Sequence, residues 1–321
     1  MANTLTEQLD SLYASTWQAV KKQVTDQIFT ATPFFYEMYK AENIEREDGG
    51  RFIEEPLMVA KNDTVAWIGR GGTVSIADTD PLTVSIWQWR NLAGSVVRMW
   101  VDDMANSGIH KKIDLLNAKI ENLRLTMIDQ LETNLFTAQS GDAMTGLPDI
   151  VEANAEASQS GSPGGISKST YTWWRNRYAT MSGLSFAVYG KQYMRDMYNT
   201  CSVGNDHPNL IITTQTVFQY YEAEAEEIQR INDSAAAELG FQTFRYKGAN
   251  LYYSPQCPSG YMYFLNLKYL KLKIDKKADF DMTEFKYIPN QLDRVAQVVT
   301  RLELVCRNPR MQGVIVAIAT A

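Results

Sequence analysis

The side chains best suited to catalysis or metal binding are scarce in this chain. Its 321 residues include two histidines, His110 and His207, and three cysteines, Cys201, Cys257 and Cys306. Zinc and iron sites need clusters of such ligands, which these separated residues do not supply. A thiolate beside an imidazole would be an activated nucleophile, but the Gly and Asn residues between Cys201 and His207 indicate a turn. We therefore predict no catalytic residue, no metal site and no cofactor, and expect free thiols in a reducing compartment.

Two glycine-rich segments do not match the loops that bind phosphate groups. Residues 69–72 read Gly-Arg-Gly-Gly, which lacks the lysine and the spacing of a P-loop and lies between two strand patterns. Residues 160–165 have no Lys-Ser/Thr pair after the required gap, and no strand pattern leads into them. We predict a hairpin tip for the first segment and a surface loop for the second.

The lysines between residues 268 and 277 form the best candidate for a nucleic-acid contact. On a strand, Lys271 and Lys273 would share one face and the aliphatic residues beside them the other, which is typical of a half-solvated edge strand. The net charge of -6 also gives no general affinity for phosphate backbones. We favour the edge strand and keep a DNA contact as the alternative.

Composition indicates an ordered protein without a membrane segment. With 45% hydrophobic and 21% charged residues, the chain can form one large or two ordinary domains. The N-terminus has no signal-peptide pattern, and the longest apolar run, near residues 314–319, is too short to cross a bilayer. We expect synthesis in a cytoplasm and no membrane partner.

The elements that would position any functional residue begin with an amphipathic pattern. Apolar residues recur at helical spacing over residues 5–28, which predicts a helix with one apolar stripe. This helix either docks on its own domain or forms an arm that reaches a neighbouring subunit. Periodicity does not separate these alternatives.

Residues 51–100 then show strand signals, punctuated by turns at 69–72 and 78–81, which predict a long hairpin or meander with a strand at 65–68. The hairpin contains Trp67, Trp87 and Trp89, too much aromatic surface for an isolated ribbon in water. We expect another surface to cover it.

A single long helix follows the hairpin. Apolar residues keep helical spacing from Asp103 to about Thr137, a length of roughly 50 Å. Charges on the opposite face exclude a membrane span, and a strict heptad is absent. The pattern favours a strut that packs along a sheet.

The remaining sequence alternates between loop, helix and strand patterns. A Gly/Ser-rich loop is predicted at 141–165, and a compact α/β lobe follows it. The strongest strand signal is the alternation at 295–307. Further helices are predicted at 189–200 and 215–231, and further strands at 210–213, 241–246, 251–254, 261–267, 269–274 and 313–319.

This order of elements resembles the capsid fold of tailed bacteriophages, first described for the Hong Kong ninety-seven phage. Three local phrases are similar to that family as well: Gly146–Val151, Gly165–Thr170 before a Trp-Trp pair, and Tyr261–Asn266. The resemblance implies an α+β fold with four parts: an N-terminal arm (1–51), an extended β-hairpin loop (52–100), a peripheral domain with a long spine helix (101–204 and 267–308) and an axial α/β domain (205–266 and 309–321).

The resemblance also implies a function. The chain would be a structural major capsid protein that forms pentamers and hexamers and closes into an icosahedral shell around double-stranded phage DNA. Its place would be the virion, after assembly in the host bacterial cytoplasm. An encapsulin-like bacterial nanocompartment protein is the nearer alternative, and an enzyme of unknown class the more distant one.

Partners follow from the same resemblance. Besides copies of itself, the chain would meet a portal protein, a decoration protein and, by non-specific proximity, the packaged DNA. The segment before the hairpin is shorter than the cleavable scaffolding segment of some family members, which indicates a separate scaffolding protein. Lys61 is the only lysine of the hairpin, but nothing near it fixes a cross-link partner. The predicted inter-subunit contacts are Glu54, Glu55, Lys61, Trp67 and Arg70.

Overall fold

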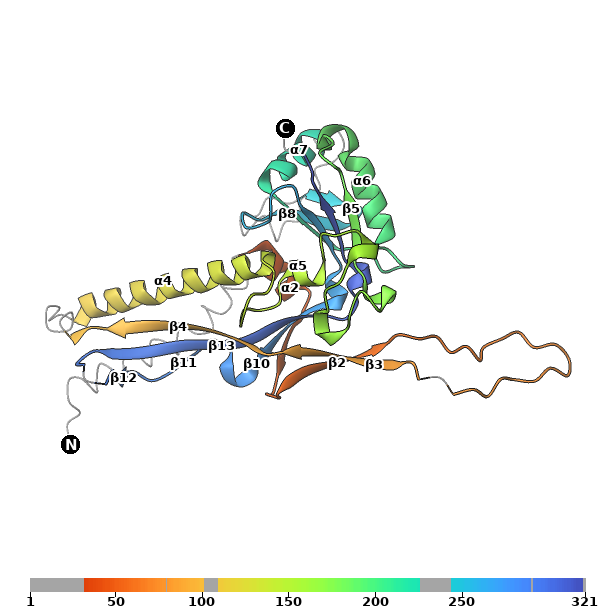
Figure 1. Cartoon of the computed structure of the whole chain (residues 1–321). Coiled ribbons are helices and arrows are strands. Elements are labelled where there is room, and N and C mark those ends of the chain that lie inside the picture. Colours follow the sequence, from red (N-terminus) through yellow and green to blue (C-terminus); the bar gives the residue numbers. More distant parts are fainter. Residues whose placement is uncertain (1–31, 79, 101–108, 226–243, 290, 320–321) are drawn as a thin grey trace.

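The computed structural model of the chain describes residues 32–78, 80–100, 109–225, 244–289 and 291–319 (Figure 1). The helix predicted at 5–28 lies outside these ranges. None of the described helices is long and apolar enough to cross a membrane. The elements form an elongated lower body, a rounded lobe above it and a hairpin that extends away from both (Figure 1).

The lower body is a six-stranded sheet built around one long strand, β13 (Arg294–Cys306). Antiparallel β4 pairs with the first part of β13, from Arg294 opposite Arg98 to Leu302 opposite Arg90, and antiparallel β10 pairs with the last part. We call this the long-strand sheet. Its other strands are β4 (Arg90–Arg98), β10 (Leu270–Asp275), β1 (Ile44–Glu47), β11 (Asp281–Met282) and β12 (Lys286–Tyr287).

Helix α4 (Ile109–Phe136) runs along this sheet beside β4, as predicted for a strut (Figure 1). Its 28 residues span about 42 Å. The absence of a side chain at Gly94 permits the close approach, since a Cβ there would lie 2.4 Å from Cδ1 of Leu123. The predicted start, from Asp103 to residue 108, falls outside the described residues.

The upper lobe is a second six-stranded sheet, in the order β5-β14-β9-β6-β8-β7, which we call the lobe sheet. Helices α6 and α7 flank it, and the predicted α/β lobe is confirmed (Figure 1). Its elements are β5 (Arg177–Thr180), α6 (Phe186–Thr200), β6 (Leu210–Thr213), α7 (Gln215–Ala225), β7 (Phe244–Tyr246), β8 (Ala249–Tyr253), β9 (Met262–Leu265) and β14 (Gly313–Val316).

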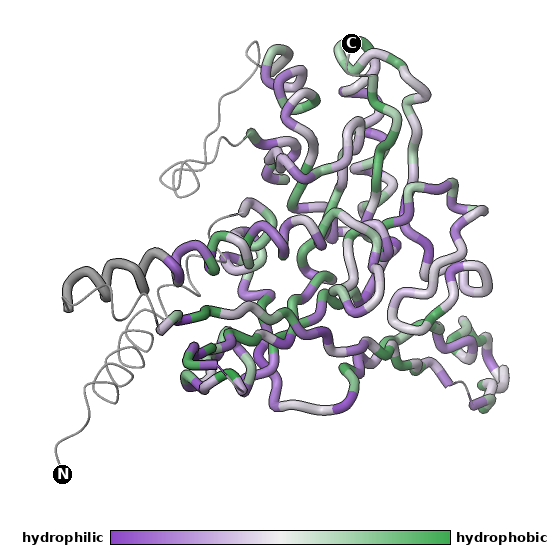
Figure 2. Tube along the Cα trace, turned by 60° about the vertical axis from the view of Figure 1, so that its left-hand side comes forward, coloured by the Kyte–Doolittle hydropathy of each residue, from purple (hydrophilic) through white to green (hydrophobic). Residues whose placement is uncertain are grey.

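Two hydrophobic cores meet at the lobe sheet. One core lies between this sheet, α4 and the long-strand sheet, and it includes Leu135, Ile212 and Leu304. The other includes Ile211 and Phe218 and is covered by α6 and α7. Strand β6, which reads Leu-Ile-Ile-Thr, is therefore buried on both faces. Figure 2 shows hydrophobic and hydrophilic segments alternating along the strands of the lower body.

The hairpin consists of β2 (Phe52–Met58) and β3 (Leu82–Gln88), paired from Phe52 opposite Gln88 to Met58 opposite Leu82. We call residues 52–88 the projecting hairpin. The strand predicted at 65–68 is wrong, because none of the described residues between 59 and 81 has a ladder partner. Two short helices complete the fold: α2 (Pro33–Lys40) and α5 (Leu147–Ile150).

Pairing places three strands differently from the predicted boundaries. Strand β1 lies in the predicted N-terminal arm, 1–51, but it pairs with β10 of the long-strand sheet. Strand β4 lies in the predicted extended loop, 52–100, but it is a full member of the same sheet. Strand β5 lies in the predicted peripheral segment, 101–204, yet it pairs in parallel with β14 of the lobe sheet, Arg177 opposite Gly313. In each case a partner far along the chain determines the sheet to which a strand belongs.

Candidate interaction surfaces

The residues predicted to contact another subunit fall into two groups. Glu54, Lys61, Trp67 and Arg70 are exposed on the projecting hairpin, and the Trp67 side chain is fully exposed, at 105%. Glu55 is 2% exposed and forms its ion pairs within the chain. Its assignment to an inter-subunit contact is corrected accordingly, because strand alternation turns it toward the long-strand sheet.

The tryptophans of this region also differ from one another. Trp87 and Trp89 are 3% and 8% exposed and are covered by the chain itself. The guanidinium carbon of Arg301, for example, lies 5.0 Å from the centre of the Trp89 ring. The expectation that another surface covers the tryptophans therefore remains only for Trp67.

One face of the β2–β3 ribbon is apolar and open to solvent. Register places Met58 opposite Leu82 and Pro56 opposite Val84, with Ile86 next along the same face. Both Met58 and Leu82 are more than 60% exposed. A contiguous apolar patch of this kind on a two-stranded ribbon is typical of a protein–protein contact.

At the root of the hairpin, the ammonium group of Lys273 lies among three carboxylates from two strands, β1 and β2. Its Nζ is 2.9 Å from Oε1 of Glu55, 2.6 Å from Oε2 of Glu45, and also pairs with Glu47. Arg307 adds a second cation, 2.6 Å from Oε2 of Glu55. The three glutamates are close enough together to hold a metal ion, but the Lys273 ammonium already pairs with each of them.

Electrostatics in this cluster favour the charged forms. Burial alone would lower the pKa of Lys273, but the hydrogen bonds that its ammonium donates to the three glutamates outweigh burial and hold that pKa above its ordinary value. Burial likewise tends to raise the pKa of Glu45, and hydrogen bonds from Lys271 and Lys273 hold it below the usual range. The root of the hairpin is thus fastened by ion pairs that persist at neutral pH.

The lysines of β10 do not form the half-solvated edge that was predicted. Strand β1 pairs with the outer side of β10, so β10 is an internal strand. Lys271 and Lys273 pair with glutamates of β1, while Lys276 and Lys268 lie 2.9 Å and 2.7 Å from Asp48 and Asp206. These pairs engage four of the five lysines between residues 268 and 277, which weakens the alternative of a DNA contact.

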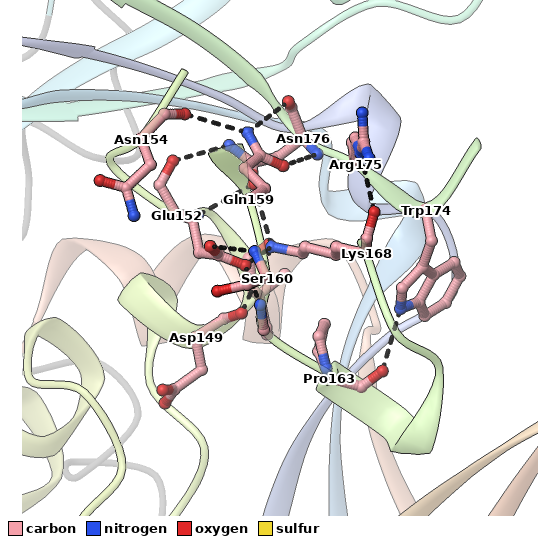
Figure 3. Close-up of polar contacts among 12 residues, drawn as sticks. Asp149, Glu152, Asn154, Gln159, Ser160, Pro163, Lys168, Trp174, Arg175 and Asn176 are labelled. Atoms are coloured by element: carbon pink, nitrogen blue, oxygen red, sulfur yellow. Dashed lines mark hydrogen bonds and ion pairs between the residues drawn. The ribbon is translucent and has the colours of Figure 1, made fainter. Parts of the chain in front are cut away.

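A second buried lysine organises the loop between α5 and β5 (Figure 3). Lys168 is inaccessible to solvent, and its Nζ lies 2.8 Å from the oxygen of Ile150, 3.0 Å from Oδ1 of Asn176 and 3.1 Å from Oε1 of Glu152. Burial lowers the pKa of Lys168, and Glu152 partly offsets this effect. Gln159 closes the network by donating to the Asn176 carbonyl at 3.0 Å. The sequence carried no signal for this burial.

The loop held by Lys168 presses against the projecting hairpin. Nε1 of Trp174 donates to the Pro163 carbonyl at 2.9 Å, which fixes the single turn at 163–165 (Figure 3). Within that turn Gly164 has φ of +64°, and a Cβ there would lie 2.9 Å from both Cβ of Ser85 and Cε2 of Trp87. A glycine is required at this position, and the contact seats the base of β3.

A cleft of about 570 Å³ opens beside this contact, lined by residues of β3, Arg90, the loop around Thr145, the 160–165 turn and Glu303. The Glu303 side chain is 1% exposed. Its Oε1 accepts a hydrogen bond from the Thr145 amide at 3.2 Å, whereas its Oε2 has no partner. Burial raises the pKa of Glu303 to about 7, against the opposing effects of Thr145 and Arg90. We call this the Glu303 cleft.

The three cysteines are free and buried, as expected. Burial raises the pKa of the Cys201 and Cys306 thiols to about 12. They remain protonated at neutral pH, so they act as small apolar residues of the core.

Comparisons with known proteins give a structural likeness only. Neither a family model nor a curated protein matches the sequence. The cyanophage A-1(L) capsid matches with a TM-score of 0.63 at 17% identity, over 87% of this chain and 90% of that one. The capsid of a native GTA particle matches with a TM-score of 0.57 at 10% identity, over 87% and 89%. The holo-SrpI encapsulin complex from Synechococcus elongatus matches with a TM-score of 0.52 at 10% identity, over 90% and 89%.

Proposed function

Because the chain has the capsid fold of tailed bacteriophages, we propose that it is a structural major capsid protein, which forms pentamers and hexamers and closes into an icosahedral shell. The observation that carries this proposal is the projecting hairpin. Its apolar face and its tip are exposed on a single subunit, although its root is fastened by buried ion pairs. A stiffly mounted apolar ribbon is suited to contact another protein surface.

The parts of the fold would divide the work of assembly. The long-strand sheet with α4 would be the peripheral domain, and the lobe sheet with α6 and α7 the axial domain at the five- and six-fold centres. The projecting hairpin would lie over an adjacent subunit and contact it through Glu54, Lys61, Trp67 and Arg70. Of the predicted N-terminal arm, 1–51, the part before β1 would form the arm, because β1 itself belongs to the long-strand sheet. Many weak interfaces of this kind become stable when a closed shell repeats them.

The partners proposed for the shell are double-stranded DNA, a separate scaffolding protein, a portal protein and a decoration protein. Assembly would take place in the cytoplasm of the bacterial host, and the product would be the virion. Pairing of four lysines in and beside β10 within the chain agrees with a wall that encloses DNA without gripping it, since these cations are already engaged by carboxylates.

A bacterial nanocompartment shell is the second candidate. The likeness to the encapsulin complex favours it, because that structure covers as much of this chain as the phage capsid does. The two candidates differ in content: a phage shell would hold DNA, and a nanocompartment would hold a cargo protein.

Negative-stain electron microscopy tests the proposal directly. The protein is purified alone and after co-expression with a scaffolding protein. Shells, capsomers or tubes are expected, and a stable monodisperse monomer under both conditions would refute the proposal. Nuclease digestion of purified shells, followed by nucleic-acid and protein gels, then separates DNA content from cargo content.

A further inference from the structure

The Glu303 cleft contains an acceptor that the chain itself leaves without a donor. A carboxylate oxygen in a buried position normally has a hydrogen-bond partner, because an unpaired one costs free energy. Oε2 of Glu303 has none, although the side chain lines a cleft of about 570 Å³. That volume is in the range of pockets that hold ligands, roughly 300–1,000 Å³.

The other charged residues that line the cleft already have partners. Oδ2 of Asp149 accepts hydrogen bonds from the amides of Gln139 and Gly146, at 2.8 Å and 3.0 Å. Glu152 is paired with Lys168. Arg90 lies 3.4 Å from Oδ1 of Asp142 and leaves its own Nε without an acceptor. With three carboxylates and one arginine in the lining, the cleft favours a cationic group that ends at Glu303.

The projecting hairpin carries cations without acceptors. In its described segments 59–78 and 80–81, the basic residues are Lys61 and Arg70, and both are exposed and without an ion pair. Arg70 lies between Gly69 and Gly71, so no bulky neighbour would hinder its entry into a cleft. A guanidinium offers five N–H donors in a plane and pairs with carboxylates more specifically than an ammonium does.

The hairpin of the same chain does not reach its own cleft. The described residues between β2 and β3 run away from the body of the molecule (Figure 1). The cleft lies at the base of the hairpin, beside the 163–165 turn. A second copy must therefore supply the cation.

We propose that the Glu303 cleft is the receptor for Arg70 of a second copy of this chain, whose guanidinium donates to Oε2 of Glu303. This inference rests on the proposed shell function and assigns one of its contacts to a donor and an acceptor. Each subunit would then offer one hairpin tip and one cleft, which is a head-to-tail contact that closes into rings. Insertion of Arg70 would also give the buried carboxylate the cation that favours its ionised form.

Disulfide trapping on the full-length protein tests this contact. Gly69→Cys places a thiol beside Arg70, and Ser160→Cys places one on the exposed rim of the cleft. Because the native cysteines are buried, they give little background. Mild oxidation of assembled G69C/S160C should give a ladder of linked chains on a non-reducing gel. The matched control G69C/V188C, with an exposed position on α6, should give none. No ladder, or equal ladders, would overturn the proposal.

Charge variants in the same background test the chemistry. Arg70→Ala and Glu303→Gln should each lower the rate of ladder formation about tenfold, and the two changes together should cost no more than either alone. Independent, additive effects would contradict a direct pair. If microscopy finds shells but the ladder is unselective, the receptor fails and the shell function stands.

If no shells form, a labelled peptide of residues 64–76 is titrated into the unassembled chain. The receptor is supported when binding weakens about tenfold in Glu303→Gln. It fails when the peptide does not bind or binds both proteins equally.

Discussion

Nζ of Lys273 lies 2.9 Å from Oε1 of Glu55, and the two side chains are only 4% and 3% exposed. This pair joins β10, in the middle of the long-strand sheet, to β2, the first strand of the projecting hairpin. The direction in which the hairpin leaves the body is therefore set by a buried ion pair as well as by the chain connection.

Breaking that pair should destabilise the subunit strongly. Lys273→Met removes the buried cation at Oε1 of Glu55 and leaves this carboxylate with Arg307 alone, which costs about 3 kcal/mol of the free energy of unfolding. The double variant Lys273→Met/Glu55→Gln should recover part of the loss, since a neutral amide replaces the carboxylate that lost its buried partner. Urea unfolding measures both. Lys276→Met, at the exposed pair with Asp48, is the control and should cost less than about 1 kcal/mol.

Stability should depend on pH through Glu303. Burial raises the pKa of this carboxyl from 4.5 to about 7, so the folded protein retains a proton that the unfolded chain releases. The contribution of Glu303 to the free energy of unfolding therefore falls as pH rises from 4.5 to 7. At about 1.4 kcal/mol per pKa unit, the loss is at most about 3 kcal/mol. Glu303→Gln should exceed the parent in stability at pH 8 and approach it at pH 5. The free energy of unfolding is measured against pH for the unassembled parent and for unassembled Glu303→Gln. If it changes with pH in the same way in both proteins, this assignment is contradicted.

Lys168 should be essential for the loop between α5 and β5. Lys168→Met keeps the length of the side chain but leaves Glu152 without its cation, at a cost of about 3–5 kcal/mol. Adding Glu152→Gln should restore much of the loss. Limited proteolysis should cleave residues 152–176 faster in Lys168→Met than in the parent, because the loop is less firmly held. Equal cleavage of the two proteins would contradict this prediction.

Gly164→Ala should disturb the seat of the hairpin. The added methyl would lie 2.9 Å from Ser85 and Trp87 atoms, at a φ that disfavours a side chain. We expect a loss of about 1–3 kcal/mol and a change in the fluorescence of the tryptophans. Gly165→Ala, also at positive φ but with open space around it, is the matched control for the clash.

The hairpin tip should matter for assembly and not for folding. Trp67 is fully exposed, so Trp67→Ala should change the free energy of unfolding by less than about 0.5 kcal/mol. The same change should raise the protein concentration needed for shell formation, as measured by light scattering. Ala66→Ser, at the adjacent exposed position, serves as the control. Unchanged assembly in Trp67→Ala would exclude Trp67 from the interface.

Local patterns predicted the long elements well. The alternation at 295–307 became β13 (Arg294–Cys306), with Val298, Thr300 and Leu302 buried on one face, and the helical spacing before Thr137 became α4. In each case a period of apolar residues marks the face that packs against the rest of the fold.

Features that depend on distant partners could not be predicted in this way. Strand β10 was assigned to an edge because its partner β1 reads Ile-Glu-Arg-Glu, which has little strand signal, and lies more than 220 residues away. The burial of Lys168 and the raised pKa of Glu303 arise from segments that are distant in the sequence and pack around these side chains. Such packing produces no periodic pattern of apolar residues in the local sequence. The tryptophans of the hairpin separated into covered and exposed ones for the same reason.

The pairing of β13 has a consequence for synthesis. Strands β1 and β4 and helix α4 precede the lobe, whereas β13 follows all of the lobe except its strand β14 and pairs directly with β4, β10, β11 and β12. A nascent chain therefore lacks the central strand of the long-strand sheet until everything from β1 to β12 has been synthesised, and such late closure slows folding. The root of the hairpin is fastened to a complete sheet only after β13 has paired. Chains that are still being translated should therefore associate poorly with one another.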